Sequence, residues 1–176
     1  VRGVLGSLSV PIRPVPPIIS VMLGETIYNL RSALDYLIYE LAAFDSGSIQ
    51  NGTQFPIEDT PDGFRRRRNT YLKGVKDEHV AIVKTLQPCC GCDWTRVLRE
   101  ISNPDKHRRL TFAKATSTLA ITSGSTEAII TGQPVDVKGD FSVTVTFRDG
   151  LPVVETLQQL VPQVTQVLNA FNSEFK

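Results

Sequence analysis

The stretch LGETIYNLRSALDYLIYELAAF, residues 23–44, decides the fold class of the N-terminal half of the chain. Its apolar residues follow one another in alternating steps of four and three: Leu23, Ile27, Leu30, Leu34, Leu37, Leu41 and Phe44. This spacing places them in one stripe along an α-helix. Because a strict repeat of this kind keeps one seam turned toward a partner, the stretch predicts a long helix that packs in a bundle or a helix pair.

Proline, glycine and helix-capping residues divide the sequence on either side of this helix. The prolines of residues 1–21 predict an extended start, and the composition of residues 50–61 predicts a loop. Apolar spacing between stop signals then predicts three shorter helices, over residues 61–75, 77–86 and 94–101. The N-terminal half therefore has the pattern of a helical bundle.

After His107 the period of the apolar residues changes from helical to alternating. Four segments have strand-like alternation or a Thr-rich composition: residues 110–112, 116–122, 127–131 and 141–147. Residues 154–175 are again helical in pattern, and Pro162 is expected to kink or divide that helix. This order predicts an α+β fold over a single domain, residues 1–176, in which a helical bundle-like N-terminal half packs with a small antiparallel β-sheet and a C-terminal helix.

Composition and charge exclude several classes of protein. The chain has 176 residues, of which 41% are hydrophobic, and its formal net charge is +1. Such a chain can bury a core, and it is neither a disordered chain nor a disulfide scaffold. No apolar run is long enough to cross a bilayer, so we expect no membrane partner. The small net charge by itself indicates no class of ligand.

The cysteines lie together in Cys89-Cys90-Gly91-Cys92. An odd, clustered set does not form a secreted disulfide framework, and it predicts a reducing, cytoplasmic setting. A structural zinc site requires four ligands, normally in two separated pairs. The three cysteines are clustered, and His79 is the one nearby candidate for a fourth ligand. We therefore expect no metal site and no cofactor.

Charge is locally uneven although its sum is small. Residues 64–76 hold basic residues and no acid, and the members that we single out as a basic patch are Arg65, Arg66, Arg67, Arg68 and Lys73. A second acid-free run covers residues 106–114. Two such runs that meet in space form a patch that attracts phosphate backbones. The alternative is a solvated helix face whose cations pair with carboxylates of the same chain.

The segment NPDKHR, residues 103–108, carries the densest set of chemical groups. An imidazole beside cations can transfer a proton at neutral pH while its neighbours hold a phosphate, so His107 is the candidate catalytic residue. The candidate binding residues around it are Asn103, Asp105, Lys106 and Arg108. The alternative is structural: Asn103 caps a helix and His107 hydrogen-bonds into the sheet.

Arg31 and Asp35 add a second polar set on the first helix. They are four residues apart and lie on one shoulder of its apolar stripe. The simplest interpretation is a helix ion pair. Because the pair lies beside the buried seam, it could also contact His107 or Arg108 of a neighbouring element. Arg31 and Asp35 are therefore candidate binding residues of a polar pocket.

Four phrases occur in order along the chain: GETIYNLRSALD (24–35), QFPI (54–57), LQP (86–88) and NPDKHR (103–108). In these phrases the chain resembles a family of uncharacterised bacterial proteins with the same Leu-Arg-Ser-Ala-Leu-Asp helix and the same Asn-x-Asp-Lys-His-Arg motif. The resemblance covers roughly residues 16–112. It implies no established activity, and it marks the Arg31/Asp35 helix and the His107 turn as signatures of the family.

The chain also has a weaker resemblance to the HEPN group of helical ribonucleases and nucleotide-binding domains. Asn103 and His107 match the Asn-x-x-x-His part of that group's motif, and Ser102 stands at the position of its arginine. This resemblance implies a metal-independent endoribonuclease. In such an enzyme His107 acts as acid or base at the 2′-hydroxyl, and Lys106, Arg108 or Arg31 stabilises the charge of the phosphorane.

Two functions therefore remain open. The first is a cytoplasmic, non-catalytic binding module, homo-oligomeric through its apolar helix seams, whose polar pocket takes an unknown small ligand. The second is a HEPN-like endoribonuclease or nucleic-acid-binding protein whose partner is RNA. The two differ in whether His107 is accessible to a substrate.

Overall fold

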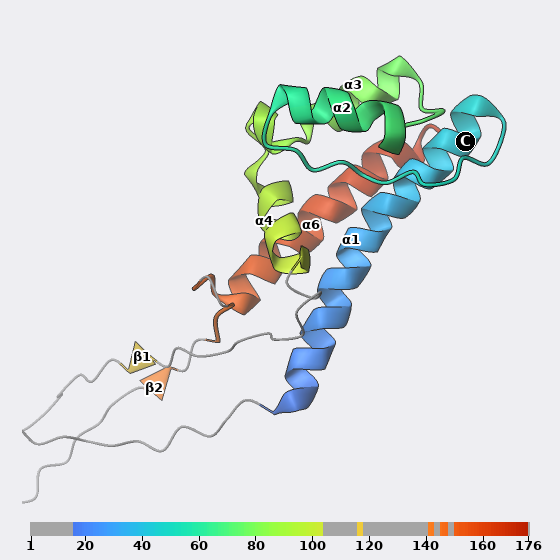
Figure 1. Ribbon diagram of the computed structural model, residues 1–176. Coiled ribbons are helices and arrows are strands. Elements are labelled where there is room, and N and C mark those ends of the chain that lie inside the picture. Colours follow the sequence, from blue (N-terminus) through green and yellow to red (C-terminus); the bar gives the residue numbers. More distant parts are fainter. Residues whose placement is uncertain (1–15, 104–115, 118–140, 143–144, 148–149, 176) are drawn as a thin grey trace, which may run out of the picture. The chain divides into compact units, whose positions relative to one another are not determined.

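A computed structural model describes residues 16–103, 116–117, 141–142, 145–147 and 150–175 (Figure 1). The chain divides into two units, Pro17–Leu110 with Val154–Lys176 and Val1–Pro16 with Thr111–Val153. The helices are α1 (Pro17–Ser46), α2 (Pro61–Tyr71), α3 (Asp77–Thr85), the 3-10 turn η1 (Pro88–Cys90), α4 (Asp93–Ser102) and α6 (Val153–Asn172). The strands are β1 (Thr116–Ser117) and β2 (Phe141–Ser142).

Helix α1 begins earlier than the sequence predicts. It starts at Pro17, within the stretch expected to be extended, because proline at the first helical position gives up no intrahelical hydrogen bond. The predicted stripe is buried at its centre, and the buried residues of α1 are Ile27, Leu34, Leu37, Ile38, Leu41 and Ala42. Phe44, at the end of the stripe, is exposed. None of the helices described, α1 with its 30 residues included, has the length and apolar character needed to cross a bilayer.

The two middle helices begin at capping groups. The Thr60 hydroxyl accepts a hydrogen bond from the Gly63 N–H at 3.0 Å and caps α2. Asp77, where the third helix is predicted to begin, is the first helical residue of α3, and Lys76 is its capping residue. The Asp45 carboxylate, from the end of α1, accepts the N–H of the capping residue Lys76 at 2.8 Å. A side chain of another helix thus fixes the start of α3.

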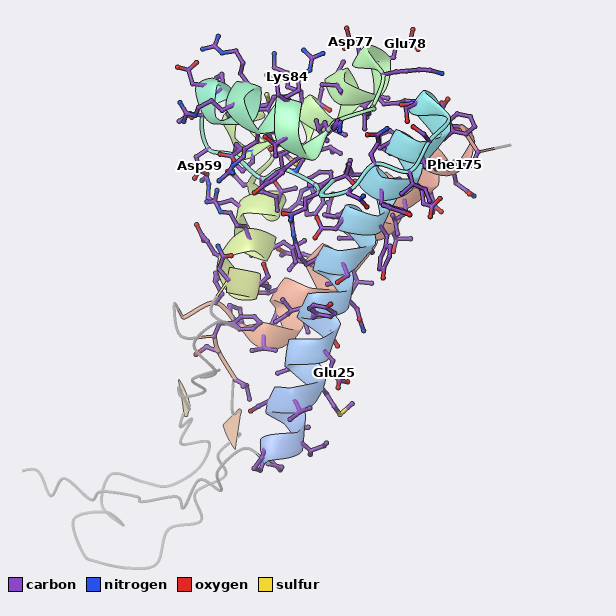
Figure 2. The ribbon with its side chains drawn as sticks, turned by 45° about the vertical axis from the view of Figure 1, so that its right-hand side comes forward. Glu25, Asp59, Asp77, Glu78, Lys84 and Phe175 are labelled. Carbon is purple, nitrogen blue, oxygen red and sulfur yellow. The ribbon has the colours of Figure 1, made fainter. Side chains whose placement is uncertain are left out.

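The core of the helical unit involves α1, α4 and α6. Helix α4 packs against α1 and buries Leu98 and Ile101. Helices α1 and α6 run in the same direction with their C-terminal ends together, where the ring centroids of Phe44 and Phe175 are 5.5 Å apart (Figure 1 and Figure 2). Helix α6 continues through Pro162 as one element and is buried at Leu160, Val164, Val167 and Phe171.

The prediction of an α+β fold with a small antiparallel sheet is wrong. The described part of the chain is helical, and its extended pairing is limited to β1 with β2, two residues each, and the isolated bridge between Thr146 and Pro152. Alternating apolar residues fit a half-buried pleat, but they form a sheet only where several strands pair. The predicted strands at 110–112 and 127–131, and most of 116–122, lie outside the described residues.

Candidate functional site

Arg31 and Asp35 form the predicted ion pair, and both also bind the backbone of Phe55. Arg31 Nη2 lies 2.9 Å from Asp35 Oδ1. The same nitrogen donates to the carbonyl oxygen of Phe55 at 2.6 Å, and Asp35 Oδ1 accepts the Phe55 N–H at 2.8 Å. Phe55 is fully buried, so the pair satisfies both polar groups of a residue that water does not reach.

Burial controls the electrostatics of this pair. It lowers the pKa of Arg31, and attraction to Asp35 opposes that shift only in part. Burial likewise raises the pKa of Asp35, although Arg31 and the Phe55 N–H both lower it. The two side chains are 22% and 33% exposed. Burial therefore shifts the pKa of each group toward its neutral form, and the attraction between the two charges opposes the shift.

The segment around Phe55, residues 54–59, was predicted as part of a loop; its residues 55–57 are buried, and side chains of several elements bind its backbone. The amide oxygen of the buried Gln87 accepts the Glu58 N–H at 3.0 Å. Arg99 of α4 donates to the Ile57 carbonyl at 3.1 Å. Arg99 also lies 2.9 Å from Asp59, and this bond lowers the pKa of Asp59. Residues of the phrases 24–35, 54–57 and 86–88 thus meet in one network. We call this network the Phe55 clamp: the side chains of Arg31, Asp35, Gln87 and Arg99 bound to the backbone of residues 55–58.

Of the candidate residues in the NPDKHR segment, the structure describes only Asn103. Asn103 is exposed and follows α4 as its C-terminal cap residue. Because α4 packs against α1, the helix that leads into the NPDKHR segment is a neighbour of the helix that carries Arg31 and Asp35. The remaining candidates, Asp105, Lys106, His107 and Arg108, lie outside the described residues, and their roles remain predictions.

Most of the basic patch on α2 has carboxylate partners within the chain. Arg65 pairs with Asp62 at 2.7 Å, Arg67 with Glu58 at 3.5 Å, and Arg68 with Asp77. Arg67 also lies over the ring of Tyr71, 4.9 Å from its centroid. Arg66 and Lys73 are exposed and have no carboxylate within ion-pair distance among the described residues. This arrangement matches the alternative interpretation of the basic patch, a solvated helix face whose cations pair with carboxylates of the same chain. Arg66 and Lys73 are the two members without such a partner among the described residues.

An open groove of about 460 Å³, which the sequence did not predict, lies between α3, the loop that follows it, the start of α4, and α6. Its apolar lining comes from Ile82, Leu86, Trp94, Val167, Ala170 and Phe171. The volume falls within the range of small-molecule sites, which are concave and mostly apolar. Trp94 is half-buried and is the single tryptophan of the chain.

Neutral groups provide nearly all of the polarity of the groove. They are the amides of Gln163 and Gln166, the hydroxyl of Thr85, and the thiols of Cys90 and Cys92. Asp93 is the one charged residue among the described residues that line it, and its carboxylate lies 3.2 Å from Arg96 Nη1. The described lining residues therefore present no cation to a phosphate or carboxylate ligand.

The cysteine loop forms one edge of the groove. All three cysteines are free thiols, and the Sγ atoms of Cys89 and Cys90 are 3.8 Å apart. Burial raises the pKa of the Cys89 and Cys92 thiols. Among the described residues, no group of three or more His, Cys, Asp or Glu side chains is arranged to hold a metal ion.

A second polar cluster, also missed from the sequence, joins the ends of three helices. His79 of α3 is buried, and its Nδ1 lies 2.7 Å from Oδ2 of Asp45, whose side chain is fully buried. Its Nε2 lies 3.6 Å from Glu174, just after α6, and its ring meets the edge of Phe171. Asp45 also accepts the Lys76 N–H. The cluster ties α1, α3 and the end of α6 together.

Only one local signal could have indicated the groove. Trp94 stands two residues after the last cysteine, at the start of a predicted helix, and a large aromatic beside a turn is a frequent feature of binding surfaces. The residues of α6 that complete the groove follow about seventy positions later, by the separation of Trp94 from Gln163. No spacing rule connects such distant segments.

The comparisons with known proteins give no relative. No protein-family model matches the sequence, and no curated protein and no solved structure is significantly similar to it. The candidate site therefore stands on the geometry of the chain itself.

Proposed function

We propose that the helical unit is a non-catalytic binding module, and that the groove between α3, α4 and α6 takes an uncharged apolar or aromatic group of its ligand. The observation that carries this proposal is the composition of the groove: an apolar surface with Trp94 at one side, neutral polar groups around it, and no cation among its described lining residues. A ligand that covers this apolar area binds favourably, because the area is removed from water. A few amide and hydroxyl contacts then orient the ligand.

The chemistry of the lining narrows the class of ligand. A phosphate or carboxylate would find no positive partner among the lining residues that the structure describes, and burying an unpaired anion is costly. A neutral ring can stack against Trp94 while the Gln163 and Gln166 amides hydrogen-bond its polar edge. The proposal thus moves the ligand away from Arg31 and Asp35, whose charges already serve the Phe55 clamp.

Nile red, an uncharged aromatic dye, is a direct probe of this proposal. Trp94 is the single tryptophan, so its fluorescence reports on the groove alone. We expect saturable dye binding that quenches Trp94 and persists when the salt concentration is raised, because no charge pairing is involved. Absence of saturable quenching, or binding that salt abolishes, contradicts the proposal.

The setting that we propose is a bacterial cytoplasm, with more than one copy of the chain in the assembly. Free thiols at all three cysteines support the reducing compartment. Exposed apolar side chains near the start of α1, namely Ile18, Val21, Met22 and Tyr28, support self-association through that helix. Sedimentation over a range of concentrations tests the oligomer: Val21→Glu should lower the apparent mass, whereas a monomeric wild-type chain contradicts it.

A metal-independent endoribonuclease or RNA-binding protein is the second candidate. The helical architecture of the described unit supports it, because the resemblance to the HEPN group implies a helical fold, and Asn103 directly follows α4, which packs against α1. In this proposal His107 is the acid or base, and Lys106 and Arg108 hold the phosphate. Arg66 and Lys73 offer additional cations.

Incubation with mixed RNA in EDTA separates the two candidates. The endoribonuclease predicts cleavage by the wild type and none by His107→Ala. Equal cleavage by both, or none by either, removes it. For RNA binding without cleavage, Arg66→Ala with Lys73→Ala should weaken retention in a salt-dependent way, while Arg65→Ala, which removes an arginine already paired with Asp62, is the matched control.

A further inference from the structure

We propose that Cys89 and Cys90 form a reversible disulfide at the edge of the groove, made by exchange with a low-molecular-weight disulfide such as oxidised glutathione. Their Sγ atoms are already 3.8 Å apart, which is the closest approach between thiols that the described residues show. A disulfide requires about 2.05 Å between its sulfurs, so closure needs rotation of the two side chains together with a local adjustment of the backbone that joins them.

The exchange uses the two thiols in order of their exposure. Cys90 is exposed and lines the groove, whereas Cys89 is half-buried. The Cys90 thiolate attacks one sulfur of the oxidised reagent, forms a mixed disulfide, and releases one reduced thiol. The Cys89 thiolate then attacks the Cys90 sulfur and releases the second. Two electrons pass to the reagent, and the two protons lost from the cysteines reach the released thiols.

The backbone around the pair makes this bond easy to reverse. The Cα atoms of adjacent residues are about 3.8 Å apart across a trans peptide, below the range of about 4.4–6.8 Å that unstrained disulfides prefer. A strained disulfide has a higher reduction potential and is readily reduced. The pair also sits in a fixed turn, since the Cys90 and Cys92 N–H groups both donate to the Gln87 carbonyl and Gly91 adopts a left-handed conformation at φ +87°.

Closure of this bond would alter the groove that the proposed function uses. Cys90, Gly91 and Cys92 form its edge, and Trp94 stands two residues after Cys92, in the first turn of α4. A change in the turn therefore changes the surroundings of Trp94. This regulatory consequence rests on the proposed function, whereas formation of the disulfide does not.

The test treats the native full chain with oxidised glutathione and counts the remaining thiols after denaturation. We expect the count to fall from three to one, with the loss of two hydrogen masses and full return under dithiothreitol. Cys92→Ser should still lose two thiols, and Cys89→Ser and Cys90→Ser should form no internal disulfide. Peptide mapping of the wild type after differential alkylation identifies the bonded pair without any variant.

Three results overturn the inference: all three thiols stay titratable, a glutathione adduct persists on Cys90, or the mapped bond involves Cys92. Nile red titration of the oxidised and reduced chains then addresses the groove separately. Weaker dye binding in the oxidised form supports the regulatory role. Dye binding that fails in both forms counts against the proposed function and leaves the disulfide standing.

Discussion

Arg31 and Asp35 hold the same residue, Phe55, by its two backbone groups: Arg31 Nη2 donates to the carbonyl oxygen at 2.6 Å, and Asp35 Oδ1 accepts the N–H at 2.8 Å. One turn of α1 thus replaces the water or the strand partner that an extended segment would otherwise need. The role is structural, and it accounts for the position of these charges beside the apolar seam.

Replacing Arg31 by Met should destabilise the protein by about 2–3 kcal/mol, because the part-buried Asp35 carboxylate and the Phe55 carbonyl each lose a charged partner. Urea denaturation measures this loss. Arg65→Met removes an arginine from an exposed pair with Asp62 and should cost less than about 1 kcal/mol. Equal losses for the two variants would mean that the clamp contributes no more than a surface ion pair.

The difference in the free energy of unfolding between the wild type and Asp35→Asn should depend on pH. Burial raises the pKa of Asp35 in the folded state, so the native chain binds a proton that the unfolded chain has released. That contribution is complete below the unfolded value of about 3.9 and is lost as the pH rises through the folded value. We therefore expect the wild type to gain stability relative to Asp35→Asn as the pH falls from neutral toward that value.

Urea midpoints of both proteins, collected between about pH 7 and pH 4, provide the comparison. If the stability difference between the two proteins stays constant, pairing balances burial; if the wild type instead loses stability relative to Asp35→Asn at acid pH, pairing outweighs burial. Either result contradicts the prediction.

His79→Leu should cost about 3 kcal/mol, because it leaves the fully buried Asp45 carboxylate without the imidazole that lies 2.7 Å away. Glu174→Gln is the control, since that carboxylate is 47% exposed and 3.6 Å from the ring. It should cost less than about 1 kcal/mol. Calorimetric melting of both variants decides the question, and similar melting temperatures would contradict the role assigned to the cluster.

The helices were predictable from the sequence because their signals are local. Apolar spacing and stop residues located the central part of α1, α2 from Pro61, α4 and α6 to within a few residues of their observed ends. The start of α1 was missed because proline can begin a helix as well as prevent one. The sheet was wrongly predicted because alternation is a weak signal that depends on partner strands.

The contacts that define the candidate site were not predictable in the same way. Arg31 and Phe55 are 24 positions apart, and His79 and Asp45 are 34 apart. Residues 54–59 read as a loop by composition, yet residues 55–57 are buried, because side chains of α1 and α4 together with Gln87 bind the backbone of this segment. The phrases quoted for the family resemblance include Arg31, Asp35 and Phe55, but nothing in their spacing indicates that these residues contact one another.

The most direct test of the central claim, that the groove is the ligand site, compares Nile red binding by Ala170→Phe and Ala81→Phe. Both alanines are exposed on helices; Ala170 lines the groove and Ala81 does not. The same added ring should therefore weaken dye binding about tenfold or more at Ala170, a loss of at least about 1.4 kcal/mol, and leave it unchanged at Ala81. Equal affinity of the two variants for the dye would contradict the account.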